Sequence, residues 1–169
     1  PNAMGVIQFV AEAEVPMLAP VGTAAVVLPM TDQKKWVFKT TQNDEIIAEA
    51  LIDHMVKNGV KRLGFIGLND PYGENWLRVV SEMAKAKGIE LVAVERFQRG
   101  DSSVTGQSLK VIAARPDAVL VAAAGGPAVL PHTTLVDQGY KGTIYQTHGA
   151  ALPDFLKLGG KKVEGTVLA

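Results

Sequence analysis

The chain has 169 residues, 47% of them hydrophobic, and its 17 basic and 17 acidic residues leave no net charge. This composition is typical of a globular protein with ample core material, and the lack of a basic block argues against nucleic acid as a partner. No cysteine is present, which excludes disulfides and thiolate chemistry. The longest apolar stretch, residues 118–130, is too short to cross a bilayer, so we expect no direct membrane insertion.

The first 43 residues offer little material for a core of their own. A helix is predicted over residues 3–13, and short strands over 15–19 and 36–39, with a loop at 20–23. These elements are too few to form an independent domain. We therefore predict that residues 1–43 are the terminal part of one layer, joined through residues 40–43 to a second domain over residues 44–169.

The segment 61–97 organises the second part of the chain. Residues 63–67 form an apolar run without alternation, as in a strand buried on both faces, and residues 69–73 carry turn-forming residue types. A helical apolar stripe over 74–87 and a strand at 91–94 follow. A strand that returns after one helix is nearly always parallel to the first, so the loop between them opens at the carboxyl edge of the sheet, where such sheets bind ligands.

The remaining elements extend the same alternation of helices and strands. Helices are predicted over residues 44–58, 107–114, 127–138 and 153–158, and strands over 118–122, 143–145 and 165–168. A regular series of this kind favours an α/β fold with a parallel sheet flanked by helices.

Three loops should meet at the carboxyl edge of this sheet, at residues 68–73, 123–127 and 146–150. Tyr72 offers a flat ring and a hydroxyl, and Thr147 and His148 offer polar side chains. The backbone is exposed at a helix start, where N–H groups attract anions, by Ala124, Gly125 and Gly126. Each loop alone is explained by turn formation. Three such loops at one edge favour a ligand site.

Catalytic interpretations find little support in the sequence. His54 is predicted on a helix flank and His132 at a solvated helical position, and Asp70 before a proline is a turn former. His148 is the only histidine in an edge loop, and no serine motif or paired carboxylate accompanies it. The histidines lack metal-ligand spacing, and the glycines lack the dinucleotide fingerprint. We expect no enzyme activity, no metal and no cofactor.

Several motifs resemble the periplasmic solute-binding proteins of the branched-chain amino-acid type, which serve ATP-driven importers. They are VPMLAPVGT and WVFKTTQND before residue 45, LGFIGLNDPYGENW at 63–76, and GTIYQTHGAALPDFLKLGG at 142–160. The resemblance covers essentially the whole chain. It implies two α/β lobes around a cleft, with the end of lobe one at residues 1–43 and most of lobe two at 44–169. Residues 40–43 would form one hinge strand.

The resemblance also implies particular ligand contacts. In APVGT, the backbone of Val21 and the hydroxyl and amide of Thr23 would bind a ligand carboxylate, and Tyr72 would pack over the ligand. Ala124 lies where the family often has another aromatic residue, and His148 lies close to the family's acidic residue for the ligand's ammonium group. The full set of expected ligand-binding residues is Val21, Gly22, Thr23, Tyr72, Ala124, Gly125, Thr147 and His148.

The presence of His148 near the position of the family's acidic residue affects which class of ligand is expected. A buried ammonium group without a counter-charge costs several kcal/mol, so an aromatic carboxylate is favoured over a branched-chain or other hydrophobic amino acid. The resulting hypothesis is a non-catalytic binding protein that closes on a small carboxylate and delivers it to the membrane permease of an ABC importer. It would be periplasmic, or extracellular and lipid-anchored in a Gram-positive source. The alternatives are a ligand-sensing domain of a receptor or regulator, and an α/β enzyme using His148.

Overall fold

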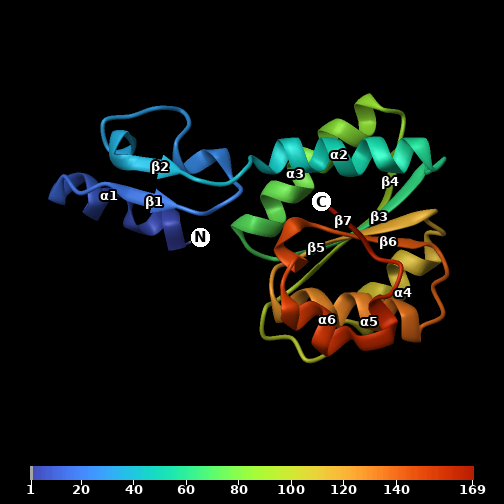
Figure 1. Cartoon of the computed structure of the whole chain (residues 1–169). Coiled ribbons are helices and arrows are strands. Elements are labelled where there is room, and N and C mark those ends of the chain that lie inside the picture. The colour runs from blue at the N-terminus through green and yellow to red at the C-terminus, as the bar shows by residue number, and fades with distance from the viewer. Residues whose placement is uncertain (1) are drawn as a thin grey trace. The chain divides into compact units, whose positions relative to one another are not determined.

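The computed structural model describes residues 2–169 and divides the chain into two compact units, Pro1–Ile46 (unit 1) and Ile47–Ala169 (unit 2) (Figure 1). The boundary falls inside helix α2, which spans Asp44–Lys57. Among the described residues, unit 1 has one hydrophobic cluster and unit 2 has two. The predicted division into lobes between residues 43 and 44 stays a prediction.

Unit 1 contains a small parallel sheet beside one helix. Helix α1 spans Asn2–Ala13, and strands β1 (Met17–Ala19) and β2 (Val37–Lys39) pair in parallel. Two short 3-10 helices, η1 (Ala24–Val26) and η2 (Lys34–Trp36), lie between the strands in sequence. The buried side chains that hold this unit together are Ile7, Ala19, Val26 and Val37.

Unit 2 is built on a five-stranded, fully parallel sheet with the order β4-β3-β5-β6-β7. The strands are β3 (Arg62–Leu68), β4 (Glu90–Phe97), β5 (Ala118–Ala122), β6 (Thr143–Gln146) and β7 (Val167–Leu168). The other helices are α3 (Pro71–Ala86), α4 (Thr105–Ala113), α5 (Val129–Asp137) and α6 (Pro153–Gly159), and the 3-10 turns are η3 (Gly126–Ala128), η4 (His148–Ala150) and η5 (Gly160–Val163). The predicted α/β fold is confirmed.

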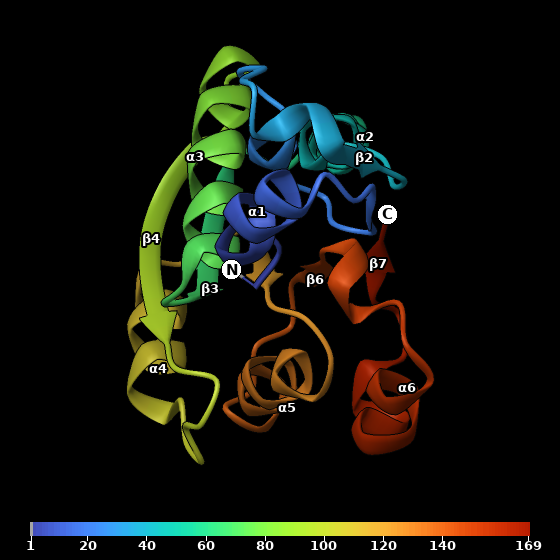
Figure 2. The ribbon, with the colours of Figure 1, turned by 90° about the vertical axis from the view of Figure 1, so that its left-hand side faces the viewer.

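Helices cover both faces of this sheet, as Figures 1 and 2 show: α2 and α3 on one face, and α4, α5 and α6 on the other. Strand β3 illustrates why its sequence lacks alternation. Phe65 packs into the cluster with α2 and α3, whereas Ile66 packs into the cluster with α4, α5 and α6. A strand buried on both faces has no position for polar side chains, so its apolar run is continuous.

The start of α3 differs from the prediction. The helix begins at Pro71 and not at residue 74, because the Asp70 side chain accepts hydrogen bonds from the backbone N–H groups of Tyr72 (2.9 Å) and Gly73 (3.0 Å). Proline suits the first helical position, since its missing N–H would have no helical partner there. The predicted turn at 69–73 is therefore largely a capped helix start, and Tyr72 lies on the first turn of α3.

Two histidines take up different environments. The prediction that His132 is solvated is wrong, because this residue of α5 is buried, with only 2% of its surface exposed. His54 lies on the exposed side of α2, as predicted, and its Nδ1 is 3.0 Å from the hydroxyl of Tyr145, which is buried in β6. Burial raises the pKa of Tyr145, so this hydroxyl stays protonated at neutral pH.

We expect replacement of Ser108 with alanine to stabilise the protein by about 1 kcal/mol. Ser108 is fully buried on α4, and its hydroxyl has no hydrogen-bond partner in the described part of the chain, so its burial is uncompensated. Urea unfolding followed by circular dichroism measures the change. Ser81→Ala is the control, because Ser81 donates to the Leu77 carbonyl at 2.6 Å, and it should give a smaller gain. A loss of stability in Ser108→Ala would contradict the prediction.

Candidate ligand-binding rim at the carboxyl edge of the sheet

Three segments that follow β3, β5 and β6 meet at one edge of the unit 2 sheet. The Tyr72 hydroxyl lies 2.8 Å from Oγ1 of Thr147, and Thr147 Oγ1 donates to the Ala123 carbonyl at 3.2 Å. The backbone N–H of Gly125 donates to the carbonyl of Gly149 at 2.9 Å. The structure thus brings together the unit 2 residues that the sequence singled out. We call Tyr72, Ala124, Gly125, Thr147 and His148 the rim.

The direction of these hydrogen bonds defines what Tyr72 offers to a ligand. A carbonyl oxygen only accepts, so the single proton of the Thr147 hydroxyl goes to Ala123. Thr147 Oγ1 then accepts, and the Tyr72 hydroxyl must donate to it. These two hydrogen bonds hold the Tyr72 side chain in place through its hydroxyl group. Its proton is committed inside the protein, so the ring is the part of Tyr72 suited to contact a ligand.

The two aromatic rings of the rim, Tyr72 and His148, pack against each other and against Trp76. The ring centroids lie 6.2 Å apart for Tyr72 and His148, 5.9 Å for Trp76 and His148, and 6.4 Å for Tyr72 and Trp76. Trp76 is fully buried, so it supports the other two rings from the core. Sequence reasoning placed Trp76 only in the helical core stripe. Its position four residues after Tyr72, on the same helix face, is the signal that could have found it.

Two glycines allow the loops to approach so closely. Gly125 has φ +67° and ψ −148°, a backbone conformation that side-chain-bearing residues rarely adopt. At Gly149, a Cβ atom would lie 2.7 Å from both the Ala123 carbonyl and the Tyr72 hydroxyl. Gly149 was not singled out from the sequence. The expected anion-attracting role of the Gly125 N–H is not supported, because that group already donates to Gly149.

Two ion pairs connect the start of α3 to the end of β4 and the turn that follows it. The Arg99 guanidinium contacts the Asp70 carboxylate at 2.8 Å, and Arg96 binds Glu74 through two nitrogens, one of them at 3.0 Å. The hydrogen bond from Arg96 lowers the pKa of Glu74. Since Tyr72 lies between Asp70 and Glu74, both pairs help to hold its backbone in place.

We expect Asp70→Ala to destabilise the protein by about 1–2 kcal/mol, because it removes the helix cap and the partner of Arg99. Asp70→Asn keeps the capping oxygen and loses only the charge, so its cost should stay below about 1 kcal/mol. Thermal or urea unfolding of the two variants separates the two contributions. Equal losses in both variants would show that the ion pair, and not the cap, carries the effect.

The ligand residues predicted in unit 1 lie in the turn after β1. The Val21 N–H donates to the Ala19 carbonyl at 2.9 Å, and its carbonyl accepts from the Thr41 hydroxyl at 2.7 Å. The Gly22 carbonyl accepts from the backbone N–H of Asp44 at 3.0 Å. Thr23 Oγ1 accepts from the Ala25 N–H at 3.2 Å as the cap of η1, and this bond leaves the hydroxyl proton for another acceptor. Thr23 is therefore the residue of this turn best suited to donate to an anion.

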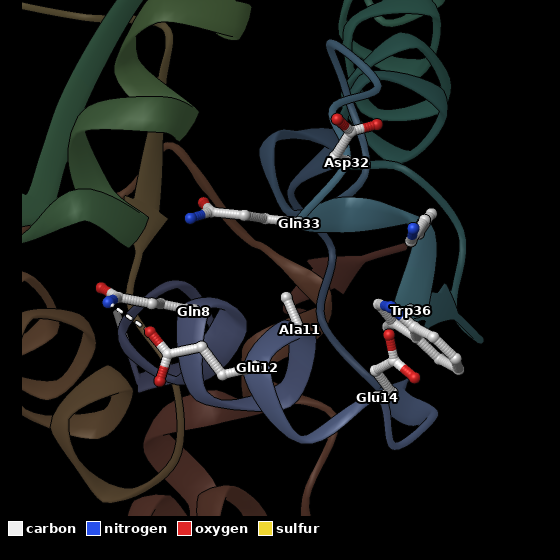
Figure 3. A pocket seen from close by; sticks show the side chains of 8 residues that line it. Gln8, Ala11, Glu12, Glu14, Asp32, Gln33 and Trp36 are labelled. Atoms are coloured by element: carbon white, nitrogen blue, oxygen red, sulfur yellow. Dashed lines mark hydrogen bonds between the residues drawn. The ribbon is translucent and has the colours of Figure 1, made fainter.

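A separate hollow of about 250 Å³ lies in unit 1 (Figure 3). It contains none of the predicted ligand residues, and its lining is mainly polar. The lining contains three carboxylates and one lysine, so the hollow does not suit an anionic ligand. Its lining residues are Gln8, Ala11, Glu12, Glu14, Asp32, Gln33, Lys35 and Trp36.

Parallel α/β sheets of this kind characteristically bind ligands outside the carboxyl ends of their strands. The family of periplasmic binding proteins matches the chain over residues 1–169, and the chain belongs to this family. This confirms the resemblance noted in the sequence. None of the helices in residues 2–169 combines the length and apolar character required to span a membrane.

Solved structures share this fold. An extracellular ligand-binding receptor from Rhodopseudomonas palustris HaA2 is 48% identical, with a TM-score of 0.94 over 97% of this chain and 45% of that chain. A branched-chain amino acid ABC transporter protein from Thermus thermophilus with bound valine is 17% identical, with a TM-score of 0.87 over 98% of this chain and 43% of that one.

A solute-binding protein of an ABC transporter from R. palustris, in complex with 4-hydroxybenzoate, is 18% identical, with a TM-score of 0.81 over 95% of this chain and 44% of that chain. The chain thus spans less than half the length of these structures. No curated protein matches the chain.

Proposed function

We propose that the protein is the solute-binding component of an ATP-driven importer and that it binds a small carboxylate, most favourably an aromatic acid. The observation that carries this proposal is the rim, where Tyr72, which follows β3, meets Thr147 and His148, which follow β6, at the carboxyl edge of the sheet. Membership of the periplasmic binding protein family supports the same function.

The chemistry of the rim favours an uncharged, flat ligand body. The rim residues include no carboxylate, and the acids on either side of Tyr72 are occupied: Asp70 by its helix cap and Arg99, and Glu74 by Arg96. An α-amino acid would leave its ammonium group without a counter-charge here, at a cost of several kcal/mol. An aromatic ring can instead pack against Tyr72 and His148 in the offset or edge-on arrangements that such rings prefer.

The carboxylate end of the ligand is proposed to bind at the turn after β1. The Thr23 hydroxyl accepts a hydrogen bond from the Ala25 N–H, so its own proton is not used in that contact. A hydrogen bond from a hydroxyl to a charged oxygen is stronger than one to a neutral acceptor. Val21 and Gly22 would then shape the turn that presents Thr23, since the Val21 N–H and the carbonyls of Val21 and Gly22 are already hydrogen-bonded within unit 1. Structures with 4-hydroxybenzoate and valine show that proteins of this fold accept carboxylates of both kinds.

We further propose a non-catalytic role. Function would come from a higher affinity for ligand in the closed form, which a membrane permease recognises, with residues 40–43 acting as one hinge strand. The protein would be located in the periplasm, or anchored by lipid outside a Gram-positive cell. The alternatives remain a sensing domain of a receptor or regulator, and an enzyme that uses His148.

The identity of the molecule that co-purifies with the full-length protein tests this proposal. Native mass spectrometry of the protein, followed by denaturation and analysis of the released small molecule, should yield an aromatic carboxylate. The Thr23→Val variant keeps the size of the side chain and removes its donor, so it should retain much less of that molecule. Release of an α-amino acid would contradict the proposed ligand, and chemical conversion of an added ligand would favour the enzyme.

A further inference from the structure

A buried hydrogen-bond network lies beneath the rim. His132 of α5 is 2% exposed, and Gln146, the last residue of β6, is fully buried. The Nε2 atom of His132 is 3.1 Å from the Lys162 carbonyl, and its Nδ1 is 3.4 Å from Nε2 of Gln146. The same Gln146 nitrogen donates to the Ala128 carbonyl at 3.2 Å. Four segments of unit 2 therefore meet at two side chains.

These contacts require one protonation state of the histidine. Carbonyl oxygens only accept, so Nε2 of His132 must carry a proton for Lys162, and the Gln146 amide must point its nitrogen at Ala128. The second amide hydrogen of Gln146 then points at Nδ1 of His132, which must be the unprotonated acceptor. The network is complete only with a neutral His132 protonated on Nε2.

The network joins the two loops that carry most of the rim. Gln146 directly precedes Thr147 and His148, and Ala128 ends the turn that follows Ala124 and Gly125. The hydrogen bond between Gln146 and Ala128 connects these two loops, and so does the backbone hydrogen bond between Gly125 and Gly149.

Protonation of His132 would break this arrangement. An imidazolium donates from both nitrogens, so its Nδ1–H would meet the amide hydrogens of Gln146. The Gln146 Oε1 atom is buried and has no hydrogen-bond partner in the described part of the chain. Rotation of the amide would bring Oε1 to the new donor, but it would also set Oε1 against the Ala128 carbonyl, acceptor to acceptor.

We infer that His132 and Gln146 are positioning residues for the rim, which hold residues 123–128 to residues 147–150 while His132 is neutral and release them when it is protonated. The ligand-binding consequence, weaker binding at acidic pH, rests on the proposed function. The release of the loops does not.

The surroundings of the ring contain little to favour its charged form. The Phe155 ring of α6 packs edge-on against His132 at 5.7 Å. Lys162 pairs with Asp137 of α5, and Lys110 pairs with Glu95. The charged side chains of α4, α6 and η5, the helices packed against α5, are Lys110, Asp154, Lys157, Lys161 and Lys162.

Burial lowers the pKa of His132 below its ordinary value of 6.5, and this depression sets the sign of the pH effect. Below pH 6.5 the unfolded chain binds a proton at this histidine more readily than the folded protein does. The stability that the neutral ring contributes is therefore fully present above that pH and is lost as the pH falls toward the lower pKa of the folded state.

The test uses the ligand-free full-length protein. Nitrogen NMR shifts of the imidazole report the tautomer, and hydrogen exchange, corrected for its intrinsic pH dependence, reports the opening of residues 123–128 and 147–150. We expect the Nε2–H tautomer, and exchange in both segments at least about fivefold faster at pH 5.5 than at pH 7.5. The pH dependence should disappear in His132→Gln, which cannot titrate in this range, and should persist in the control His54→Gln.

Three results would overturn the inference: an Nδ1–H tautomer, exchange in wild type that does not change with pH, or the same pH dependence in His132→Gln. The wild-type data alone decide the question if that variant does not fold. Benzoate affinity is measured in parallel at both pH values and should be weaker at pH 5.5 than at pH 7.5 in wild type only. Failure to bind benzoate at either pH would contradict the proposed ligand class and leave the exchange result to decide the role of His132.

Discussion

Replacement of Gly73 with alanine is expected to destabilise unit 2 by about 3 kcal/mol or more, or to prevent its folding. Gly73 is buried in the first turn of α3, and a Cβ atom placed there would lie 1.9 Å from the carbonyl oxygen of Leu68 and 2.7 Å from its carbonyl carbon. The obstacle is backbone at the end of a central strand, which cannot rotate away as a side chain would. Helix α3 would have to move off β3 and take Tyr72 with it.

Gly106→Ala is the matched control for Gly73→Ala. Gly106 lies in the first turn of α4, and a Cβ atom there would meet nothing within 4 Å. Alanine favours helix over glycine, so this variant should be about 0.5–1 kcal/mol more stable than wild type. Chemical unfolding of both variants gives the comparison. A Gly73→Ala variant as stable as Gly106→Ala would show that α3 does not pack on β3 as described.

Replacement of Tyr72 with alanine is expected to weaken binding of an aromatic carboxylate by about 30-fold or more, roughly 2 kcal/mol, because the ring supplies the contact with the ligand. Tyr72→Phe should keep the affinity within about threefold, since the hydroxyl proton is directed at Thr147 and not at the ligand. The same variant should lose about 1 kcal/mol of stability with its hydrogen bond. Calorimetric titration of the full-length protein with benzoate measures the affinities.

Tyr140→Phe controls for the loss of a tyrosine hydroxyl elsewhere. Tyr140 donates to the Pro116 carbonyl at 3.2 Å, outside the rim, so its replacement should leave the affinity unchanged. If Tyr72→Phe weakened binding as strongly as Tyr72→Ala, the hydroxyl would be shown to contact the ligand, and the hydrogen-bond direction assigned here would be wrong.

The sheet and its order along the chain follow from local patterns. The apolar runs of β3 and β5 carry no alternation because both faces are covered, and this pattern is readable without a structure. The sequence predicts the start of α3 three residues too late, at residue 74 and not at Pro71, because Asp70-Pro71 is compatible with a turn and with a capped helix. Which of these two structures forms depends on whether residues 71–74 can pack against the end of a strand, and that is a property of the tertiary structure.

The candidate site could be predicted only in part, because some of its contacts follow from the order of the strands and others depend on tertiary packing. Parallel strands send their following loops to one edge, so the meeting of Tyr72 with Thr147 could be expected from topology. The burial of His132 could not, because its partners Gln146 and Lys162 are distant in sequence and approach only in the folded unit. The hydrogen-bond direction at Tyr72 likewise depends on the Ala123 carbonyl, which no sequence pattern reveals.

The most direct test of the proposed function is the melting temperature of the full-length protein with a panel of carboxylates. We expect benzoate and 4-hydroxybenzoate to raise it in a concentration-dependent way, as ligands that bind the folded state must, and leucine and valine to raise it little or not at all. Stronger stabilisation by leucine or valine than by the aromatic acids would contradict the assignment of the rim to an uncharged aromatic body.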